Sequence, residues 1–319
     1  MTDGSTGGPS GPVRTIVLGS GRFALPMLGR LAAHPAVDVV AVVTVPPRPV
    51  GRAHVLTPTP VETQARELGL AVLTPARLRA PAALDEILAM EPTLAVLADY
   101  GQIVPSEILD LPHGALNLHP SLLPRHRGAT PIPATILAGD TETGVSLIRM
   151  DQGIDTGPLI AQEQATLAGD ETAPALEARL AIAAAGLLAR SLEPWLAGEL
   201  VATPQPETGA TMTRSLRRAD GRLDPGRDAE HLARQVRAHL PWPGSFHELP
   251  HGGRLVILSA DPAPSEPSDQ PGRLVRTPDA GLALTTADGR LVLHDVQPSG
   301  GRPMTGEAFV RGHAELLAP

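Results

Sequence analysis

The sequence contains no cysteine and no lysine. Without cysteine the chain has no disulfide framework, no thiolate nucleophile and no cysteine-ligated zinc or iron–sulfur site. All 26 basic residues are arginines, whose planar guanidinium groups make bidentate contacts to phosphate and carboxylate. A bias in codon composition would produce the same replacement of lysine by arginine.

A membrane span and a secretory signal are also missing. No apolar run approaches the ~20 residues that cross a bilayer. The opening stretch, "MTDGSTGGPSGP", has neither a charged nor an apolar segment of the kind that directs secretion. We therefore expect a cytoplasmic protein that does not enter a membrane, with residues 1–12 as a disordered leader.

The chain has enough length and apolar content for two globular domains, with 319 residues, 42% hydrophobic and 19% charged. Apolar runs that end in glycine or proline predict buried strands, and segments with helical spacing lie between them. The predicted strands are 14–19, 37–45, 70–75 and 94–101, and the predicted helices are 23–34, 61–69 and 81–90. This alternation is typical of a Rossmann-like α/β domain with a parallel sheet.

A second domain is expected after a long amphipathic helix at 172–198 and a segment rich in proline and threonine. One helix (229–239) and several short strands with turn signals predict an OB-like β-barrel there. The expected boundaries are 13–203 for the first domain, 204–213 for a linker and 214–319 for the second domain. The net charge of the whole chain is -8, so no overall basic field attracts nucleic acid.

The stretch "GSGRFA" after the first strand matches a loose dinucleotide-binding fingerprint through Gly19, Gly21 and Ala24. That fingerprint also needs an acidic residue at the end of the second strand, to hold the ribose of the nucleotide. The second strand is followed by "PPRPVGR", without an acid. We therefore expect a glycine turn that packs a helix against a strand, and a nicotinamide-dependent dehydrogenase is disfavoured.

Polar residues with catalytic potential lie in "GALNLHP", whose alternation predicts a strand with Asn117 and His119 on the same face. Such a pair can donate hydrogen bonds to an oxyanion that develops on a carbonyl group. Asp151 and Asp155 follow in a glycine-rich loop. A loop carboxylate near His119 could hold the imidazole protonated and accept a proton, and Asp155 is favoured because it lies closer to the glycine turn. Each of these residues, considered alone, is explained equally well by helix capping, packing or turn formation.

Together, the segments "NLHPSLLP" and "IDTGP" resemble the signature of the folate-dependent formyltransferases. "RPVGR", "ADYGQIVP", "RGATPI" and "HLPWPGSF" occur in the order found in that family, and the resemblance runs from Arg14 through nearly the whole chain. It is strongest to the members that act on methionyl-tRNA. The resemblance implies transfer of a formyl group from 10-formyltetrahydrofolate to initiator methionyl-tRNA, which produces N-formylmethionyl-tRNA for translation initiation. It implies no metal, no covalent enzyme intermediate and no obligate protein partner, and we expect a monomer.

The resemblance also implies roles for particular residues. Asn117 and His119 would stabilise the oxyanion, and Asp155 would orient His119 and help to move protons. Asp99, Tyr100 and Gly101 would contact the pterin, and the loop Ser121, Leu122, Leu123 and Pro124 would shape the folate channel. The predicted contacts to tRNA are Arg48 and Arg52 after the second strand, and Arg217, Arg218 and Arg254 in the second domain.

This chain departs from the family at two places. Ala53 and His54 stand where relatives often carry lysines, which weakens the expected phosphate contacts. "GSGRFA" replaces the usual Gly-Thr-Pro turn.

Three alternatives remain open at the level of sequence. The acceptor could be an amino sugar nucleotide, water could replace the amine, or the chain could bind tRNA or folate without catalysis.

Overall fold

A computed structural model of the chain describes residues 11–50, 54–250, 252–267 and 269–318. It divides into two compact units. The first comprises residues 1–128, 142–166 and 177–212, and the second comprises residues 129–141, 167–176 and 213–319. The expected leader falls almost wholly outside the described residues. The expected domain boundaries stay a prediction, because two segments before residue 204 belong to the second unit.

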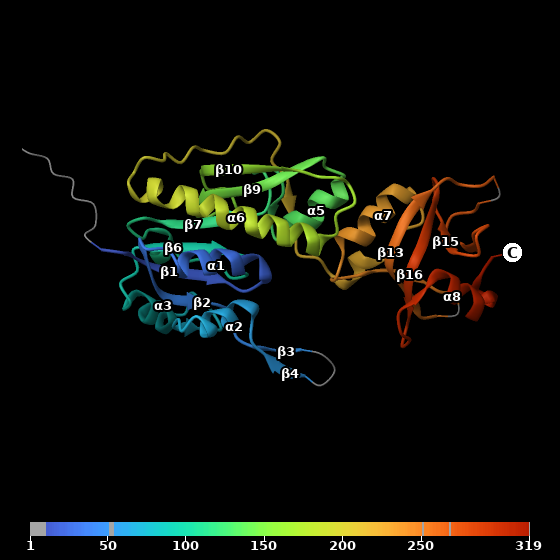
Figure 1. The fold of residues 1–319 in the computed structure, drawn as a ribbon, viewed down its shortest axis with the longest axis horizontal. Coiled ribbons are helices and arrows are strands. Elements are labelled where there is room, and N and C mark those ends of the chain that lie inside the picture. Colours follow the sequence, from blue (N-terminus) through green and yellow to red (C-terminus); the bar gives the residue numbers. More distant parts are fainter. Residues whose placement is uncertain (1–10, 51–53, 251, 268, 319) are drawn as a thin grey trace, which may run out of the picture. The chain divides into compact units, whose positions relative to one another are not determined.

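The first unit is built on a seven-stranded sheet with the strand order β10-β9-β7-β6-β1-β2-β5 (Figure 1). Strands β5, β2, β1, β6 and β7 are parallel, whereas β9 is antiparallel to β7 and β10 is antiparallel to β9. The bounds are β1 (Val13–Gly19), β2 (Val37–Val43), β5 (Val72–Leu73), β6 (Leu94–Ala98), β7 (Ala115–His119), β9 (Glu142–Arg149) and β10 (Leu159–Thr166). All five residues of β6 are buried, as expected for a strand covered on both faces.

Helices and short ordered segments connect these strands. The helices are α1 (Leu25–Ala32), α2 (Pro60–Glu67), α3 (Pro81–Leu88), α4 (Ser106–Leu109) and α6 (Ala173–Leu196), with a 3-10 turn η1 (Arg22–Ala24). Two short sheets add the hairpin β3 (Arg48–Val50) with β4 (Val55–Thr57), and the pair β8 (Arg127–Gly128) with β11 (Met212–Thr213). Local sequence explains the start of α2, where Thr59 accepts a hydrogen bond from the Glu62 backbone N–H and proline occupies the first helical position.

The two glycines of "GSGRFA" have different surroundings. A Cβ atom on Gly19 would lie 2.8 Å from the Ala24 Cβ and 2.9 Å from the Ala98 backbone oxygen. A Cβ atom on Gly21 would lie 1.6 Å from an Asp99 carboxylate oxygen. At Gly19 the backbone of Ala98 leaves no room for a side chain, so close approach of the strands accounts for this glycine. At Gly21 the obstacle is the end of the Asp99 side chain, which could shift.

The second unit has a six-stranded antiparallel sheet with the path β12-β13-β16-β15-β14, and β17 pairs with β16. The bounds are β12 (Ser245–Glu248), β13 (Arg254–Ala263), β14 (Leu274–Arg276), β15 (Leu282–Thr285), β16 (Arg290–Pro298) and β17 (Met304–Thr305). Within the described residues β12 and β14 do not pair with each other, so the sheet curls as a half-barrel. This arrangement and the mostly parallel first sheet confirm the predicted fold class.

Apolar residues of the sheet and two helices form the core of the second unit. Leu232 and Val236 of α7 and Phe309 of α8 are buried in one cluster with the sheet residues Leu255, Ile257, Leu284 and Leu293. Asp228 caps α7 by accepting a hydrogen bond from the His231 N–H. The helical elements are α5 (Pro131–Ala138), α7 (Ala229–Ala238), α8 (Gly306–Gly312), η2 (Arg218–Gly221) and η3 (Ala314–Leu316).

No helix among the described residues is both long and apolar enough to span a membrane.

Candidate active site

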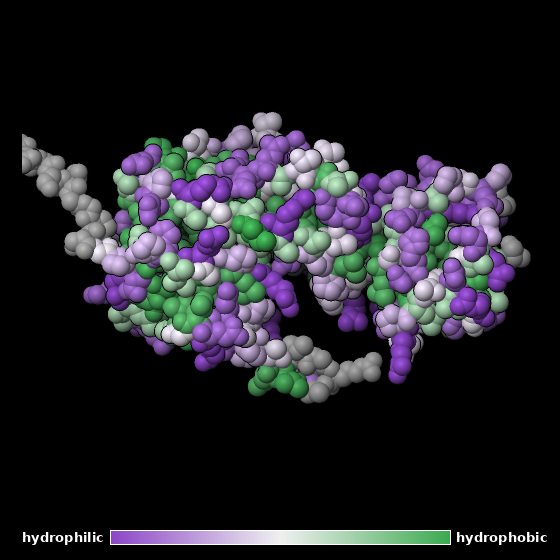
Figure 2. All heavy atoms as spheres, viewed as in Figure 1, coloured by the Kyte–Doolittle hydropathy of each residue, from purple (hydrophilic) through white to green (hydrophobic). Residues whose placement is uncertain are grey.

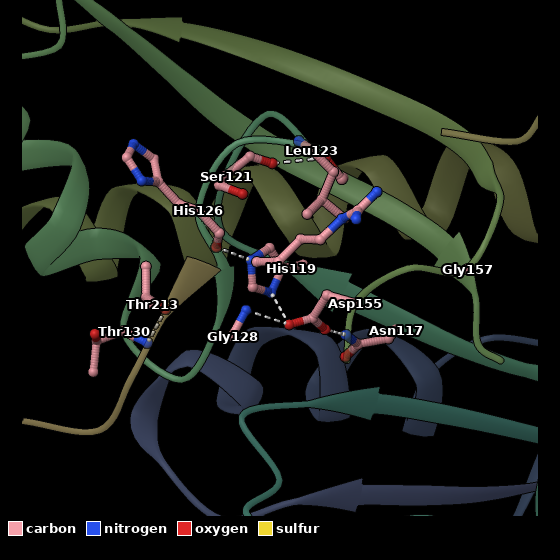
Figure 3. Close-up of polar contacts among 12 residues, drawn as sticks. Asn117, His119, Ser121, Leu123, His126, Gly128, Thr130, Asp155, Gly157 and Thr213 are labelled. Atoms are coloured by element: carbon pink, nitrogen blue, oxygen red, sulfur yellow. Dashed lines mark hydrogen bonds and ion pairs between the residues drawn. The ribbon is translucent and has the colours of Figure 1, made fainter. Parts of the chain in front are cut away.

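Asn117, His119 and Asp155 meet at the end of β7 (Figure 3). The Asn117 Nδ2 donates to Asp155 Oδ1 at 3.2 Å, and the His119 Nδ1 lies 3.5 Å from Asp155 Oδ2. Asn117 and His119 therefore share a face of β7, as their alternation predicts. The carboxylate comes from the loop between β9 and β10, and the antiparallel pairing of β9 with β7 carries this loop back to the strand.

The hydrogen bonds of His119 restrict where its protons can lie. The ring is buried, and its Nε2 lies 2.8 Å from the backbone oxygen of His126. A carbonyl oxygen only accepts hydrogen bonds, so Nε2 carries a proton. The remaining ring atom, Nδ1, faces the Asp155 carboxylate, and one proton between these two atoms satisfies both. The imidazole and the carboxylate are therefore placed for a role in proton transfer.

The loop that carries Asp155 is held in an unusual backbone conformation. Asp155 has φ 54°, in the left-handed region that few residues other than glycine adopt. The Gly128 N–H donates to Asp155 Oδ2 at 2.8 Å, so the carboxylate accepts from Gly128 and from Asn117 while it faces the imidazole. Backbone strain that the surroundings maintain is characteristic of functional sites.

Gln205 supports this loop and was missed by the sequence reasoning. Its Nε2 donates to the backbone oxygens of Asp155 at 2.8 Å and Gly157 at 2.7 Å. Its Oε1 accepts from Arg127 Nε at 3.1 Å and Nη2 at 2.9 Å. Both side chains are buried. The segment expected to be a linker thus contributes a residue that positions Asp155, and nothing in its local sequence indicated this.

Asp151 has a local structural role. Its Oδ1 accepts from the Gly153 N–H at 2.9 Å and from the Thr156 hydroxyl at 2.7 Å, and the residue is exposed. These contacts close a turn within the loop. The structure therefore brings Asp155, and not Asp151, to the histidine.

The loop Ser121–Pro124 follows β7 directly, and two of its side chains point into the protein. Ser121 and Leu123 are buried. The Ser121 hydroxyl donates to the Arg125 backbone oxygen at 2.7 Å, and the Leu123 N–H donates to the Ser146 hydroxyl at 3.0 Å. Leu122 and Pro124 are half-buried, so they are the side chains of this loop that remain accessible to a ligand.

Asp99, Tyr100 and Gly101 follow β6 at the same edge of the sheet as the end of β7. The Asp99 carboxyl lies against Gly21, and burial raises its pKa. Burial also raises the pKa of Tyr100 to about 12. The Tyr100 hydroxyl is buried without a hydrogen-bond partner among the described residues, and Gly101 is exposed. The exposed backbone of Gly101 is accessible to a polar ligand, whereas the Tyr100 hydroxyl is covered by protein.

Arg48 is exposed at the start of the hairpin β3–β4, and Arg52 lies outside the described residues. Arg48 lines a cavity of about 740 Å³ together with Arg22 and the threonines Thr57, Thr59 and Thr63. Glu67 lines the same cavity, so two guanidinium groups and several hydroxyls face an anion there beside one carboxylate. Arg22 was not among the predicted site residues, because only the glycines and the alanine of "GSGRFA" belong to the fingerprint.

Apolar side chains of the hairpin are also exposed. Val55 is 60% exposed and Leu56 is 67% exposed, and Figure 2 shows apolar side chains of this hairpin at the lower edge of the molecule. Exposed apolar residues beside an arginine are typical of a binding surface.

The three predicted arginines of the second unit have different surroundings. Arg218 lies over the ring of Trp242, 5.7 Å from its centroid, and Arg254 lies over the ring of Phe246, 4.2 Å from its centroid. The Arg217 backbone N–H donates to Asp220, while no carboxylate contacts its guanidinium in the part of the chain that is described. Arg254 covers a buried ring, so packing accounts for its position.

Asn117 is the only asparagine in the 319 residues, and the sequence contains no lysine. The same compositional bias accounts for the absence of lysine and the rarity of asparagine. A single asparagine that survives this bias at the centre of a polar cluster is a signal that residue counts alone could have provided.

No group of three His, Asp or Glu side chains in the described ranges is arranged to hold a metal ion.

Comparison with known families matches both units. A family model described as formyl transferase matches residues 13–192, and one described as formyl transferase, C-terminal domain, matches residues 215–314. The chain is 41% identical over 307 residues to methionyl-tRNA formyltransferase of Myxococcus xanthus, covering 96% of each chain. It is 43% identical over 303 residues to methionyl-tRNA formyltransferase of Thermus thermophilus, covering 94% of this chain and 96% of that one.

Solved structures with the same fold are more distant in sequence. An N-formyltransferase from Helicobacter canadensis, in complex with folinic acid and dTDP-3-aminofucose, has a TM-score of 0.64 at 16% identity and covers 88% of this chain and 98% of its own. HypX from Aquifex aeolicus, in complex with tetrahydrofolic acid, has a TM-score of 0.60 at 18% identity and covers 95% of this chain and 47% of its own. At these identities the likeness supports the fold alone.

Proposed function

This chain belongs to the formyl transferase family, and we propose that it transfers the formyl group of 10-formyltetrahydrofolate to the amino group of methionine on initiator methionyl-tRNA. The relatives named for this activity match over nearly the full length, at about 40% identity. The product, N-formylmethionyl-tRNA, starts translation.

The observation that carries this proposal is the arrangement around the Asp155 carboxylate. It accepts hydrogen bonds from the side chain of Asn117 and the backbone of Gly128, and it faces the Nδ1 of His119. Formyl transfer to an amine needs a donor to the developing oxyanion and a group that moves one proton. The three residues provide both functions, and neither requires a metal ion.

Asn117 is suited to stabilise the oxyanion. An amide nitrogen carries two hydrogens, and only one of them is used in the bond to Asp155. The second can donate to the formyl oxygen as negative charge develops on it. Because the bond to Asp155 already fixes the amide, little reorganisation is needed during the reaction.

The expected role of His119 as a second donor to the oxyanion does not fit its contacts, because both ring nitrogens already face protein oxygens. His119 and Asp155 are instead suited to move the proton. The attacking amine loses a proton as its nitrogen bonds to the formyl carbon, and the folate nitrogen gains one as its bond to that carbon breaks. The imidazole–carboxylate pair can accept the first proton and return it in the second step. Bound 10-formyltetrahydrofolate supplies the electrophilic formyl carbon.

Several residues at the edge of the sheet fit this co-substrate. Leu122 and Pro124 offer accessible apolar surface for a ring, and Gly101 offers exposed backbone. The Tyr100 hydroxyl has no hydrogen-bond partner among the described residues. We assign pterin contact to these residues and to Asp99, while Ser121 and Leu123 hold the loop in place.

The hairpin β3–β4 and the second unit are the proposed contacts with tRNA. Arg48 and Arg22 line one cavity, in which a phosphate group would be paired with two guanidinium groups. Arg52 belongs to the same proposed surface and lies outside the described residues. Arg217 and Arg218 are the proposed contacts in the second unit, whereas Arg254 is a weaker candidate because it packs over Phe246.

We further propose that the protein is a monomer that acts in the cytoplasm, where initiator tRNA is charged. Residues 13–203 would form the catalytic domain and residues 214–319 the tRNA-binding domain, with 204–213 between them.

An amino sugar nucleotide is the alternative acceptor, because structural neighbours include sugar N-formyltransferases. Their sequence identity is only 15–18%, whereas the relatives named for methionyl-tRNA match along the whole chain. The test offers the purified protein 10-formyltetrahydrofolate with charged initiator methionyl-tRNA, and separately with a UDP-amino sugar. We expect transfer to tRNA alone, and its loss in Asn117→Ala. Transfer to the sugar alone would refute the proposed acceptor.

A further inference from the structure

The chain has very few aromatic residues, and one of them is placed on the surface. The six aromatic residues are two tryptophans, one tyrosine and three phenylalanines, and all six are described. Trp242 is 53% exposed, whereas the others are buried or half-buried. Burial of a large aromatic side chain stabilises a fold by about 2–3 kcal/mol. An exposed tryptophan forgoes much of this gain, which suggests a role in binding.

Trp242 is presented by a rigid turn. Pro241 and Pro243 flank it, and each proline ring fixes its own backbone φ angle. The Gly244 N–H donates to the backbone oxygen of His239 at 2.9 Å, which closes the turn. The turn also packs tightly on η2, since a Cβ atom on Gly221 would lie only 2.0 Å from the Gly244 oxygen. A ring held in this way loses little conformational freedom when a ligand stacks on it.

An arginine without a carboxylate partner lies over the exposed ring, in a segment rich in arginine. Residues 214–222 contain four arginines and one aspartate, a local charge of +3 in a chain of net charge -8. Arg214 pairs with Asp220, and Arg222 pairs with a glutamate at 3.1 Å. Neither the Arg217 nor the Arg218 guanidinium contacts a carboxylate among the described residues, and Arg218 lies over the Trp242 ring. The exposed ring is thus combined with unneutralised positive charge.

We propose that Trp242 is a stacking site for an unpaired nucleotide of the tRNA, with Arg217 and Arg218 contacting the phosphates on either side. This inference rests on the proposed function. A nucleobase offers a flat π surface to an aromatic ring, and its phosphates pair with guanidinium groups. A protein segment would need separate residues to match the ring and to pair with the two guanidinium groups, whereas a nucleotide carries a flat base and a phosphate in one unit. The combination therefore favours single-stranded RNA at this turn.

Fluorescence gives a test that does not depend on catalysis. The chain has two tryptophans, so Trp195→Phe leaves Trp242 as the only tryptophan reporter. Trp195 donates to the His113 backbone oxygen from α6, and its replacement leaves the turn unchanged. Titration of this variant with uncharged initiator tRNA should quench most of the Trp242 emission in a saturable manner. Saturable tRNA binding, measured by filter retention, without any change in that emission would refute the stacking site.

Kinetics of formyl transfer provide the second readout. Trp242→Ala should raise the KM for methionyl-tRNA roughly 5- to 100-fold with kcat nearly unchanged, because stacking contributes equally before and during reaction. Trp242→Phe should recover most of the affinity, since it keeps an aromatic face. Arg218→Ala should raise KM and lower the salt dependence of binding by about one phosphate contact. The exposed Arg276 of β14 provides the charge-matched control, and Arg276→Ala should change neither quantity.

Two outcomes distinguish a failure of the stacking site from a failure of the proposed function. Formylation of methionyl-tRNA with an unchanged KM in Trp242→Ala would refute the stacking site and leave the function intact. Quenching by tRNA without formyl transfer in the wild-type protein would support the site and refute the function.

Discussion

An Asp155→Asn substitution replaces one carboxylate oxygen by an amide nitrogen and keeps the shape of the side chain. The carboxylate accepts from Asn117 Nδ2 at 3.2 Å and from the Gly128 N–H at 2.8 Å, and it faces His119 Nδ1 at 3.5 Å. An asparagine side chain has a single acceptor oxygen, so it cannot accept hydrogen bonds from Asn117 on one side and from Gly128 on the other. One of these donors loses its partner, and the negative charge beside the imidazole is lost in either orientation.

The expected consequence is mainly catalytic. Loss of a positioned group that moves a proton lowers the rate by roughly 10²–10⁴-fold, which corresponds to about 3–5 kcal/mol in the activation barrier. The Asp155 side chain is 14% exposed, and leaving one donor unpaired there should lower the free energy of unfolding by about 1–3 kcal/mol. The affinity for the folate co-substrate should stay within about threefold of wild type, because the change affects the transition state more than the bound state.

The assay is single-turnover formylation of charged initiator tRNA at saturating enzyme, with urea denaturation of the same samples. Asp151→Asn is the matched control, since it makes the same chemical change in the same loop at a residue that only closes a turn. The reasoning fails if Asp155→Asn reacts within threefold of wild type, or if Asp151→Asn loses as much activity.

Three further substitutions test other parts of the structure. Gln205→Glu should lower kcat about tenfold or more while folate binding persists. The reason is that a carboxylate would face the two backbone oxygens to which the amide nitrogen now donates hydrogen bonds. Steady-state kinetics with 10-formyltetrahydrofolate measure both quantities. Arg48→Ala should raise the KM for tRNA several-fold and flatten its salt dependence by about one contact, whereas an unchanged salt slope would remove Arg48 from the interface. Asp269→Asn should lower the free energy of unfolding by about 1–3 kcal/mol at pH 7, because Asp269 pairs with the buried Arg290. That contact lowers the pKa of Asp269, so the stabilisation is present above the ordinary carboxyl pKa of about 4 and is lost as pH falls below it. Wild type and variant should therefore converge in acid, and an equal difference at pH 3 and pH 7 would contradict the pairing.

Much of the fold could be predicted from the sequence because its signals are local. Apolar runs and helical spacing identified the strands of the first sheet: β2, β5 and β6 lie within the predicted segments, and β1 starts one residue before its predicted segment. Period-two alternation in β7 placed Asn117 and His119 on one face. Short elements with weak periodicity were missed, including the hairpin β3–β4 and the helices α5 and α8.

The sequence by itself determined the chemical groups of the candidate site and the direction in which the β7 pair points, since side-chain alternation depends only on the local backbone. Only the tertiary structure decided what these groups meet. The conformation of the loop after β9 brought Asp155, and not Asp151, to the histidine, and the chain path brought Gln205, 50 residues further on, against the backbone of Asp155. Contacts between distant segments depend on the path of the whole chain, and the spacing of residues within a short segment does not reveal that path.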